Sequence, residues 1–278
     1  MTQKIIKMKH TILYTLAIAI SALLLTACEE VIDIDLNSSN PRIVVEATIE
    51  PDSVCEVLLT YSANYFNNQK PTVIDNAVVT ITDNLGSNES LLNIGNGRYK
   101  GSNIKGFINR SYTLDVVTNN HQISGTAKIP SKGLIIDVVA KESEPLFGNS
   151  NDFKEYYLEV ILKDDPIQSN YYLLEFSSNN FQFDQRMQYV DDKNFGENNL
   201  ATIKQWRNGY YVGDQATVTV YSVDKNVYLF HKQLQEIISG GGMGGPTSTP
   251  YNPQSNMTPD ALGCFMARSI DKVTIDIK

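Results

Sequence analysis

Histidine, tryptophan and cysteine are scarce in this chain, which holds three histidines, one tryptophan and three cysteines among its 278 residues. None of them falls in a His-Glu-x-x-His or Cys-x-x-Cys pattern, so the usual sequence marks of a zinc site are missing. No serine lies in a Gly-x-Ser-x-Gly elbow, and the glycines between 240 and 245 lack the Lys-Ser/Thr of a phosphate-binding loop. The sequence therefore predicts no enzyme activity, no metal and no cofactor.

Basic residues are in the minority, with 23 Lys and Arg against 31 Asp and Glu and a formal charge of −8. Such a surface is repelled by the phosphates of nucleic acids and by anionic lipid headgroups, which disfavours both as partners. No apolar run after residue 27 approaches the ~20 residues that a membrane-spanning helix needs.

Residues 1–27 read as a lipoprotein signal peptide. Three lysines precede an apolar segment at 12–25 that is too short to span a membrane. The sequence Leu-Thr-Ala-Cys at 25–28 resembles the bacterial lipobox, which implies cleavage between Ala27 and Cys28. It also implies a diacylglycerol thioether on Cys28 and a further acyl chain, such as palmitate, on the freed amine. The alternative is an ordinary secretory signal with an incidental cysteine.

Short strand-like segments fill residues 28–130. Apolar and acidic residues alternate at 31–36, and 42–49, 55–61 and 77–82 are rich in aliphatic and β-branched residues. Gly-Asn-Gly at 95–97 is a strong hairpin signal. Several short strands at near-regular spacing, without helical periodicity, predict an N-terminal β-sandwich domain.

Residues 131–278 are predicted to form a second sandwich, with the domain boundary in Pro-Ser-Lys-Gly at 130–133. Its expected strands are 135–140, 155–162, 171–177, 181–187, 216–223, 262–267 and 273–277. One segment departs from the strand pattern. Apolar residues recur at helical spacing over 224–239, with Asp224 as a plausible N-cap, and residues 240–254 are rich in Gly, Pro, Ser and Thr. The prediction is an all-β protein of two immunoglobulin- or transthyretin-like sandwiches, one amphipathic helix at 224–239 and a flexible loop at 240–254. The apolar positions of that helix are Val227, Phe230, Leu234, Ile237 and Ile238.

Two cysteines remain once Cys28 carries lipid. Cys55 and Cys264 could form a disulfide in an oxidising compartment, or each could be a small buried hydrophobe in a strand. Both readings stay open because a sequence does not supply the Cα separation that a disulfide requires.

Other candidate site residues are adjacent pairs. The tyrosine pairs at 156–157, 171–172 and 210–211, together with Trp206, could form a stacking surface for a partner or a glycan, or could reflect ordinary strand composition. The aspartate pairs at 164–165 and 191–192 could build a carboxylate site, although adjacent acids in loops are usually just solvated.

Several motifs together resemble a family of uncharacterised Bacteroidota lipoproteins, catalogued as domain of unknown function 4249. The family opening, a lipidated cysteine before Val-Ile-Asp-Ile-Asp-Leu, is matched by Cys28 and 31–36. Further matches are Val-Val-Glu at 44–46, Ala-Val at 77–78, Gly-Arg-Tyr at 97–99, Asn-Pro-Gln-Ser-Asn at 252–256 and Leu-Gly-Cys-Phe at 262–265. The chain departs from the family at Asn76, where glycine is common, and at Cys264, where an aromatic is common.

The resemblance implies a protein anchored by lipid in the outer membrane, on its periplasmic face or at the cell surface. It implies an accessory role beside a TonB-dependent receptor in nutrient uptake; a stand-alone adhesion or glycan-binding lipoprotein is the alternative. Glu29 and Glu30 could act as an export signal to the surface, or could be two solvated charges on a tether.

The lipid anchor can be tested by substitution. Cys28→Ala removes the sulfur that forms the thioether, so we expect an uncleaved precursor that takes up no fatty acid. Metabolic labelling with an alkyne fatty acid measures this, and Cys55→Ala is the control that leaves residues 25–28 intact. Wild-type labelling of the Cys28→Ala chain would overturn the assignment.

Overall fold

The computed structural model describes residues 40–63, 70–118, 120–143, 154–180, 187–205, 209–238 and 251–278. Residues 40–278 form one compact unit. Ala27, Cys28, Glu29, Glu30 and Trp206 lie outside the described residues, as do most of the expected strand at 181–187 and most of the expected loop at 240–254. What was predicted for them stays a prediction.

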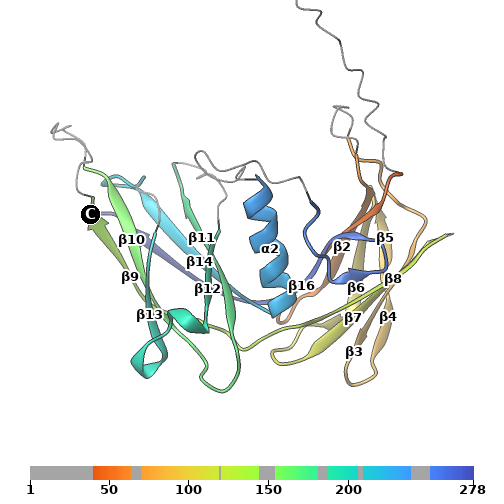
Figure 1. Ribbon diagram of the computed structural model, residues 1–278, viewed down its shortest axis with the longest axis horizontal. Coiled ribbons are helices and arrows are strands. Elements are labelled where there is room, and N and C mark those ends of the chain that lie inside the picture. Colours follow the sequence, from red (N-terminus) through yellow and green to blue (C-terminus); the bar gives the residue numbers. More distant parts are fainter. Residues whose placement is uncertain are drawn as a thin grey trace, which may run out of the picture. The chain divides into compact units, whose positions relative to one another are not determined.

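The described residues form sixteen strands and one α-helix, which confirms the all-β prediction with its single helix (Figure 1). The strands of the first half are β1 (Ile43–Ile49), β2 (Val54–Tyr61), β3 (Val78–Asp83), β4 (Asn88–Ser90), β5 (Leu92–Gly95), β6 (Arg98–Lys105), β7 (Ser111–Val117) and β8 (Gln122–Lys128). Those of the second half are β9 (Leu134–Glu142), β10 (Tyr156–Lys163), β11 (Tyr171–Ser178), β12 (Gln188–Asp191), β13 (Leu200–Lys204), β14 (Gln215–Val223), β15 (Met257–Thr258) and β16 (Leu262–Asp276). The helix is α2 (Lys225–Ile238), and the short 3₁₀ turns are η1 (Asp192–Asn194) and η2 (Glu197–Asn199).

One eight-stranded sheet runs through the unit in the order β12-β11-β14-β16-β1-β2-β6-β5. The long strand β16 joins its two halves, because residues 262–267 pair in parallel with β1 and residues 268–276 pair antiparallel with β14. The first sandwich therefore contains a strand from the end of the chain and is not built from residues 28–130 alone.

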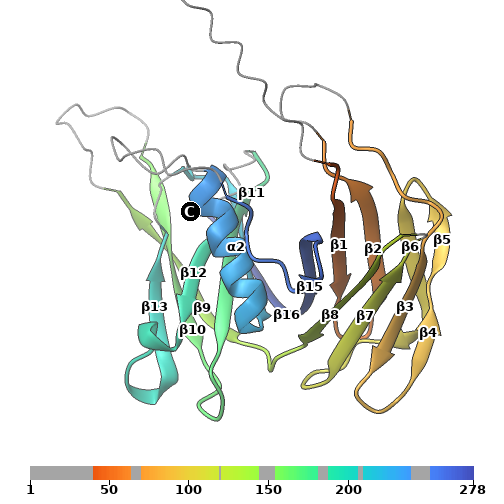
Figure 2. The same ribbon diagram turned by 45° about the vertical axis from the view of Figure 1, so that its right-hand side comes forward.

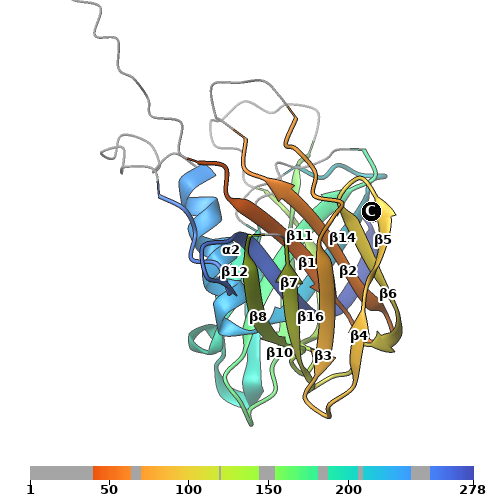
Figure 3. The same ribbon diagram turned by 90° about the vertical axis from the view of Figure 1, so that its right-hand side faces the viewer.

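Two smaller sheets cover one face of the eight-stranded sheet. The five-stranded sheet β15-β8-β7-β3-β4 encloses a core with β1, β2 and β6, as the view in Figure 3 shows for the layer of β8, β7, β3 and β4. The three-stranded sheet β13-β10-β9 encloses a second core with β11 and β14. Phe265 of β16 lies in the first core and Val273 packs against the second, so both cores lie on the same face of β16.

Helix α2 packs on the opposite face of the eight-stranded sheet, beside β11 and β16 (Figure 2). Asp224 caps it as predicted, since its Oδ1 accepts the backbone N–H groups of Asn226 at 2.9 Å and Val227 at 3.0 Å. Phe230 is buried and Leu234 packs at the margin of this third cluster. Ile238, which the sequence assigned to the apolar stripe, is 76% exposed because the helix ends there, at the edge of the cluster. No helix of the described residues is long and apolar enough to cross a membrane.

The connection between β8 and β9, where the sequence predicted the domain boundary, is fastened to the large sheet. The N–H of Gly133 donates to Ser222 Oγ at 2.9 Å, and the N–H of Ile135 donates to Asp271 Oδ2 at 2.8 Å. Lys132 forms an ion pair with Asp271 at 2.8 Å. Side chains of β14 and β16 thus fix the position of this segment.

Strand β16 begins with a close approach to β1. Gly263 has a φ of +84° and pairs with Val45, and a Cβ on Gly263 would lie 2.1 Å from the Val45 carbonyl oxygen. Glycine fits here for two reasons. Residues with a side chain rarely adopt this backbone conformation, and the carbonyl of Val45 leaves no space for a Cβ.

These two reasons can be separated by substitution. We expect Gly263→Ala to lower the free energy of unfolding by about 2–4 kcal/mol, combining a left-handed backbone with overpacking. Gly86→Ala is the control, because Gly86 has a φ of +91° and a Cβ added there would meet nothing within 4 Å, so only the backbone cost of about 1 kcal/mol applies. Urea unfolding measures both, and equal losses would contradict the close approach.

Candidate binding groove

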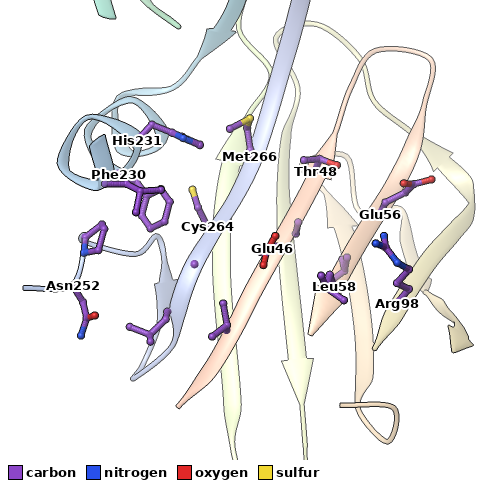
Figure 4. Close-up of a pocket in the computed structure, with 17 residues that line it drawn as sticks. Glu46, Thr48, Glu56, Leu58, Arg98, Phe230, His231, Asn252, Cys264 and Met266 are labelled. Atoms are coloured by element: carbon purple, nitrogen blue, oxygen red, sulfur yellow. The ribbon is translucent and has the colours of Figure 1, made fainter. Parts of the chain in front are cut away.

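A groove of about 700 Å³ lies between α2 and the part of the eight-stranded sheet that the helix leaves uncovered (Figure 4). Strands β16, β1, β2 and β6 form its floor. Phe230, His231 and Leu234 of α2 form one wall, and Asn252 and Pro253 extend it. The groove therefore combines segments from both ends of the chain.

Strand alternation selects the side chains of the floor. Four residues of β1 point into the first core: Ile43, Val45, Ala47 and Ile49. The alternate residues Val44, Glu46 and Thr48 therefore lie on the groove side. The register then aligns one row across four strands, because Glu46 pairs with Cys264 on β16 and with Leu58 on β2, and Leu58 pairs with Arg98 on β6. Figure 4 shows Cys264, Glu46, Leu58 and Arg98 in this order.

The part of the groove next to the helix is apolar. Cys264 and Met266 of β16 are each 7% exposed, and Phe230 of α2 is 8% exposed. Leu234 is partly buried against the same cluster. This end of the groove offers an apolar surface to an apolar group of a ligand.

The part farther from the helix carries charge. Glu46 and Arg98 are exposed, and among the residues that the structure describes neither side chain has a hydrogen bond or an ion pair. The adjacent row differs, because Glu56 pairs there with Lys100 at 2.6 Å. Glu46 and Arg98 are thus an acid and a base available to a ligand.

Cys264 and His231 line the same groove, the combination from which a thiol nucleophile and its base could be built. Burial, with a smaller effect from Asp224, raises the pKa of the Cys264 thiol. Burial, assisted by the charge of Arg268, lowers the pKa of His231 to about 4. Both side chains are therefore neutral near pH 7, whereas a nucleophilic cysteine acts as the thiolate. Neither side chain is therefore in the charge state that a thiolate–imidazolium pair requires.

The disulfide that the sequence left open does not form. Cys55 and Cys264 are both free and buried. Cys55 points into the first core, whereas Cys264 belongs to the cluster under α2, so the eight-stranded sheet separates them. Burial first, and then Glu56 and Glu89, raises the pKa of the Cys55 thiol to about 12, so it is an inert hydrophobe.

The paired acids are used in local structure. Asp165 accepts the N–H of Ile167 at 3.1 Å and the hydroxyl of Ser131 at 2.8 Å. Asp191 caps η1, and Asp192 accepts the N–H of Asn170 at 2.8 Å. Within the described ranges, no group of three or more His, Cys, Asp and Glu could hold a metal ion.

The outward tyrosines do not form one surface. Tyr171 faces α2, with its ring 5.1 Å from that of Tyr228. Tyr157 lies on the far side of the three-stranded sheet, under Lys204 Nζ at 4.1 Å from its ring. Tyr172 and Tyr210 are fully buried. The pairs lie in different layers, so the stacking surface considered from the sequence is not assembled from them.

A second pocket, of about 760 Å³, lies near β4 and β6. Its carboxylates are already occupied by the chain: Glu89 accepts backbone N–H groups of residues 102–104, and Asp83 pairs with Arg110 at 3.0 Å. Burial opposes ionisation of Glu89, but the three N–H donors outweigh it and lower the pKa of this carboxyl. The fold itself uses the carboxylates of this pocket, and we take the groove beside α2 as the candidate site.

Comparison with known protein families gives a match over most of the chain. The profile of a protein family described as a domain of unknown function, DUF4249, matches residues 29–274. A search of curated proteins finds no match.

Proposed function

The chain belongs to the DUF4249 family, a domain of unknown function, and we propose that it is a non-enzymatic binding protein anchored by lipid in the outer membrane. The observation that carries this proposal is the groove beside α2. It joins a buried apolar end to an acid and a base whose side chains have no partner among the described residues. Ligand sites commonly have this composition, mostly apolar with a few polar groups that orient the ligand.

The absence of an activated nucleophile in the groove also favours binding. Cys264 and His231 are neutral at physiological pH, because burial disfavours the charged form of each. A protein that captures a ligand and releases it unchanged needs no reactive group.

We propose further that the protein serves a TonB-dependent receptor in nutrient uptake. Its support is the resemblance to lipoproteins of that setting, together with the shortness of the tether. The stretch between Cys28 and Asn40 reaches at most about 40 Å when fully extended, so a lipid on Cys28 would keep the groove near receptors in the same membrane. Glu29 and Glu30, at the start of this stretch, are the proposed signal for display at the cell surface.

The receptor association is testable by purification. From native membranes in mild detergent, we expect the lipidated protein to bring a large β-barrel receptor with it, identified by mass spectrometry. An unrelated lipoprotein of the same cells, purified in parallel, controls for non-specific recovery of abundant barrels. Recovery of the protein alone, from cells that express such receptors, would contradict the accessory role and favour stand-alone adhesion or glycan binding.

A further inference from the structure

We propose that the groove binds a short extended peptide with free termini, placing its amino group at Glu46, its carboxylate at Arg98 and an apolar side chain over Leu58. The inference depends on the groove being the ligand site, as argued above, and adds the chemical class of the ligand. It rests on spacing, on charge and on the apolar wall.

The spacing of the two charges matches the length of a tripeptide. Glu46 lies on β1 and Arg98 on β6, with Leu58 of β2 paired to both. Neighbouring strands lie about 4.8 Å apart, so the two backbones are separated by about 10 Å. An extended peptide advances about 3.3 Å per residue, and three residues cover this distance. The row therefore matches the termini of a tripeptide laid across the strands.

Within the described residues, neither of the two charged side chains has a partner. The side chains of Glu46 and Arg98 are exposed and make no hydrogen bond or ion pair with any other residue that the structure describes. One row away, Glu56 and Lys100 neutralise each other at 2.6 Å. A zwitterion that lies along the first row meets an opposite charge at each end, whereas along the second row it would have to break an ion pair.

The surface between and beside the two charges is apolar. Leu58 separates them on the floor, Val44 and Leu262 line the same floor, and Phe230 and Leu234 form the wall. A central apolar side chain of the peptide would bury area against Leu58, and each Å² removed from water contributes about 25 cal/mol.

Two other ligand classes fit less well. A glycan needs flat aromatic platforms and many hydrogen-bonding groups, but among the described residues that line the groove Phe230 is the one aromatic side chain other than His231. An acyl chain would cover Glu46 and Arg98 without offering either a partner, which costs free energy for each charge desolvated. The peptide alone among the three uses both charges and the apolar wall.

The test titrates the lipidated protein in detergent with Ala-Leu-Ala by calorimetry, with injections into empty micelles subtracted. We expect acetylation of the amino end, or amidation of the carboxyl end, to weaken binding to the wild type about two- to fivefold, as for a solvent-exposed ion pair. Acetylation should make no difference in Glu46→Gln, and amidation should make none in Arg98→Gln. The dipeptide Ala-Leu and the pentapeptide Ala-Ala-Leu-Ala-Ala should bind more weakly than the tripeptide.

The neighbouring ion pair supplies matched controls. Glu56→Gln and Lys100→Gln make the same chemical changes one row away, and both variants should keep the full sensitivity to acetylation and amidation. Equal binding of free and blocked peptides to the wild type would overturn the inference, and so would equal effects of Glu46→Gln and Glu56→Gln. Absence of any peptide binding overturns it as well. Receptor recovery is measured separately, so a failure of the proposed function is read from that experiment alone.

Discussion

Strand β16 pairs with both β1 and β14, and this double pairing joins the two halves of the fold. At Ala267 and Arg268 the strand passes from a parallel partner to an antiparallel one, and a single eight-stranded sheet results. The two smaller sheets then share one face of it, which leaves the other face to α2. Gly263 allows β16 to meet the backbone of β1. Without this strand, helix and groove floor would belong to separate bodies.

The chemistry of the groove follows from this layering. The helix is too narrow to cover the whole sheet, so β1, β2 and β6 keep a face that no helix or strand of the described residues covers. Alternation places Glu46, Leu58 and Arg98 on this face. Near the helix the same sheet is buried and apolar. Burial there raises the pKa of Cys264 and lowers that of His231, so both side chains are neutral near pH 7. One continuous surface thus passes from apolar to charged over a few strands, as a binding site requires.

Local patterns in the sequence predicted much of the fold and little of the site. Strand-like composition identified β1 and β14, and helical spacing with a capping aspartate identified α2. Two strands were predicted at 262–267 and 273–277, because the mostly polar stretch Ser269–Lys272 concealed that β16 is one strand. The short strands β12, β13 and β15 were not predicted. Nothing local indicates that β1 pairs with a strand more than two hundred residues away. Because the row from Cys264 to Arg98 exists only in that register, neither the groove nor the separation of Cys55 from Cys264 could be predicted.

We propose that ligands and partners bind at the open face beside α2. Photo-cross-linking in cells tests it most directly, with a photoreactive amino acid in place of Leu58 on the groove floor and, for comparison, in place of Leu85, which is 70% exposed at a distant turn. We expect discrete adducts from position 58 and none above background from position 85. Equal adducts at the two positions, or adducts from position 85 alone, would contradict it.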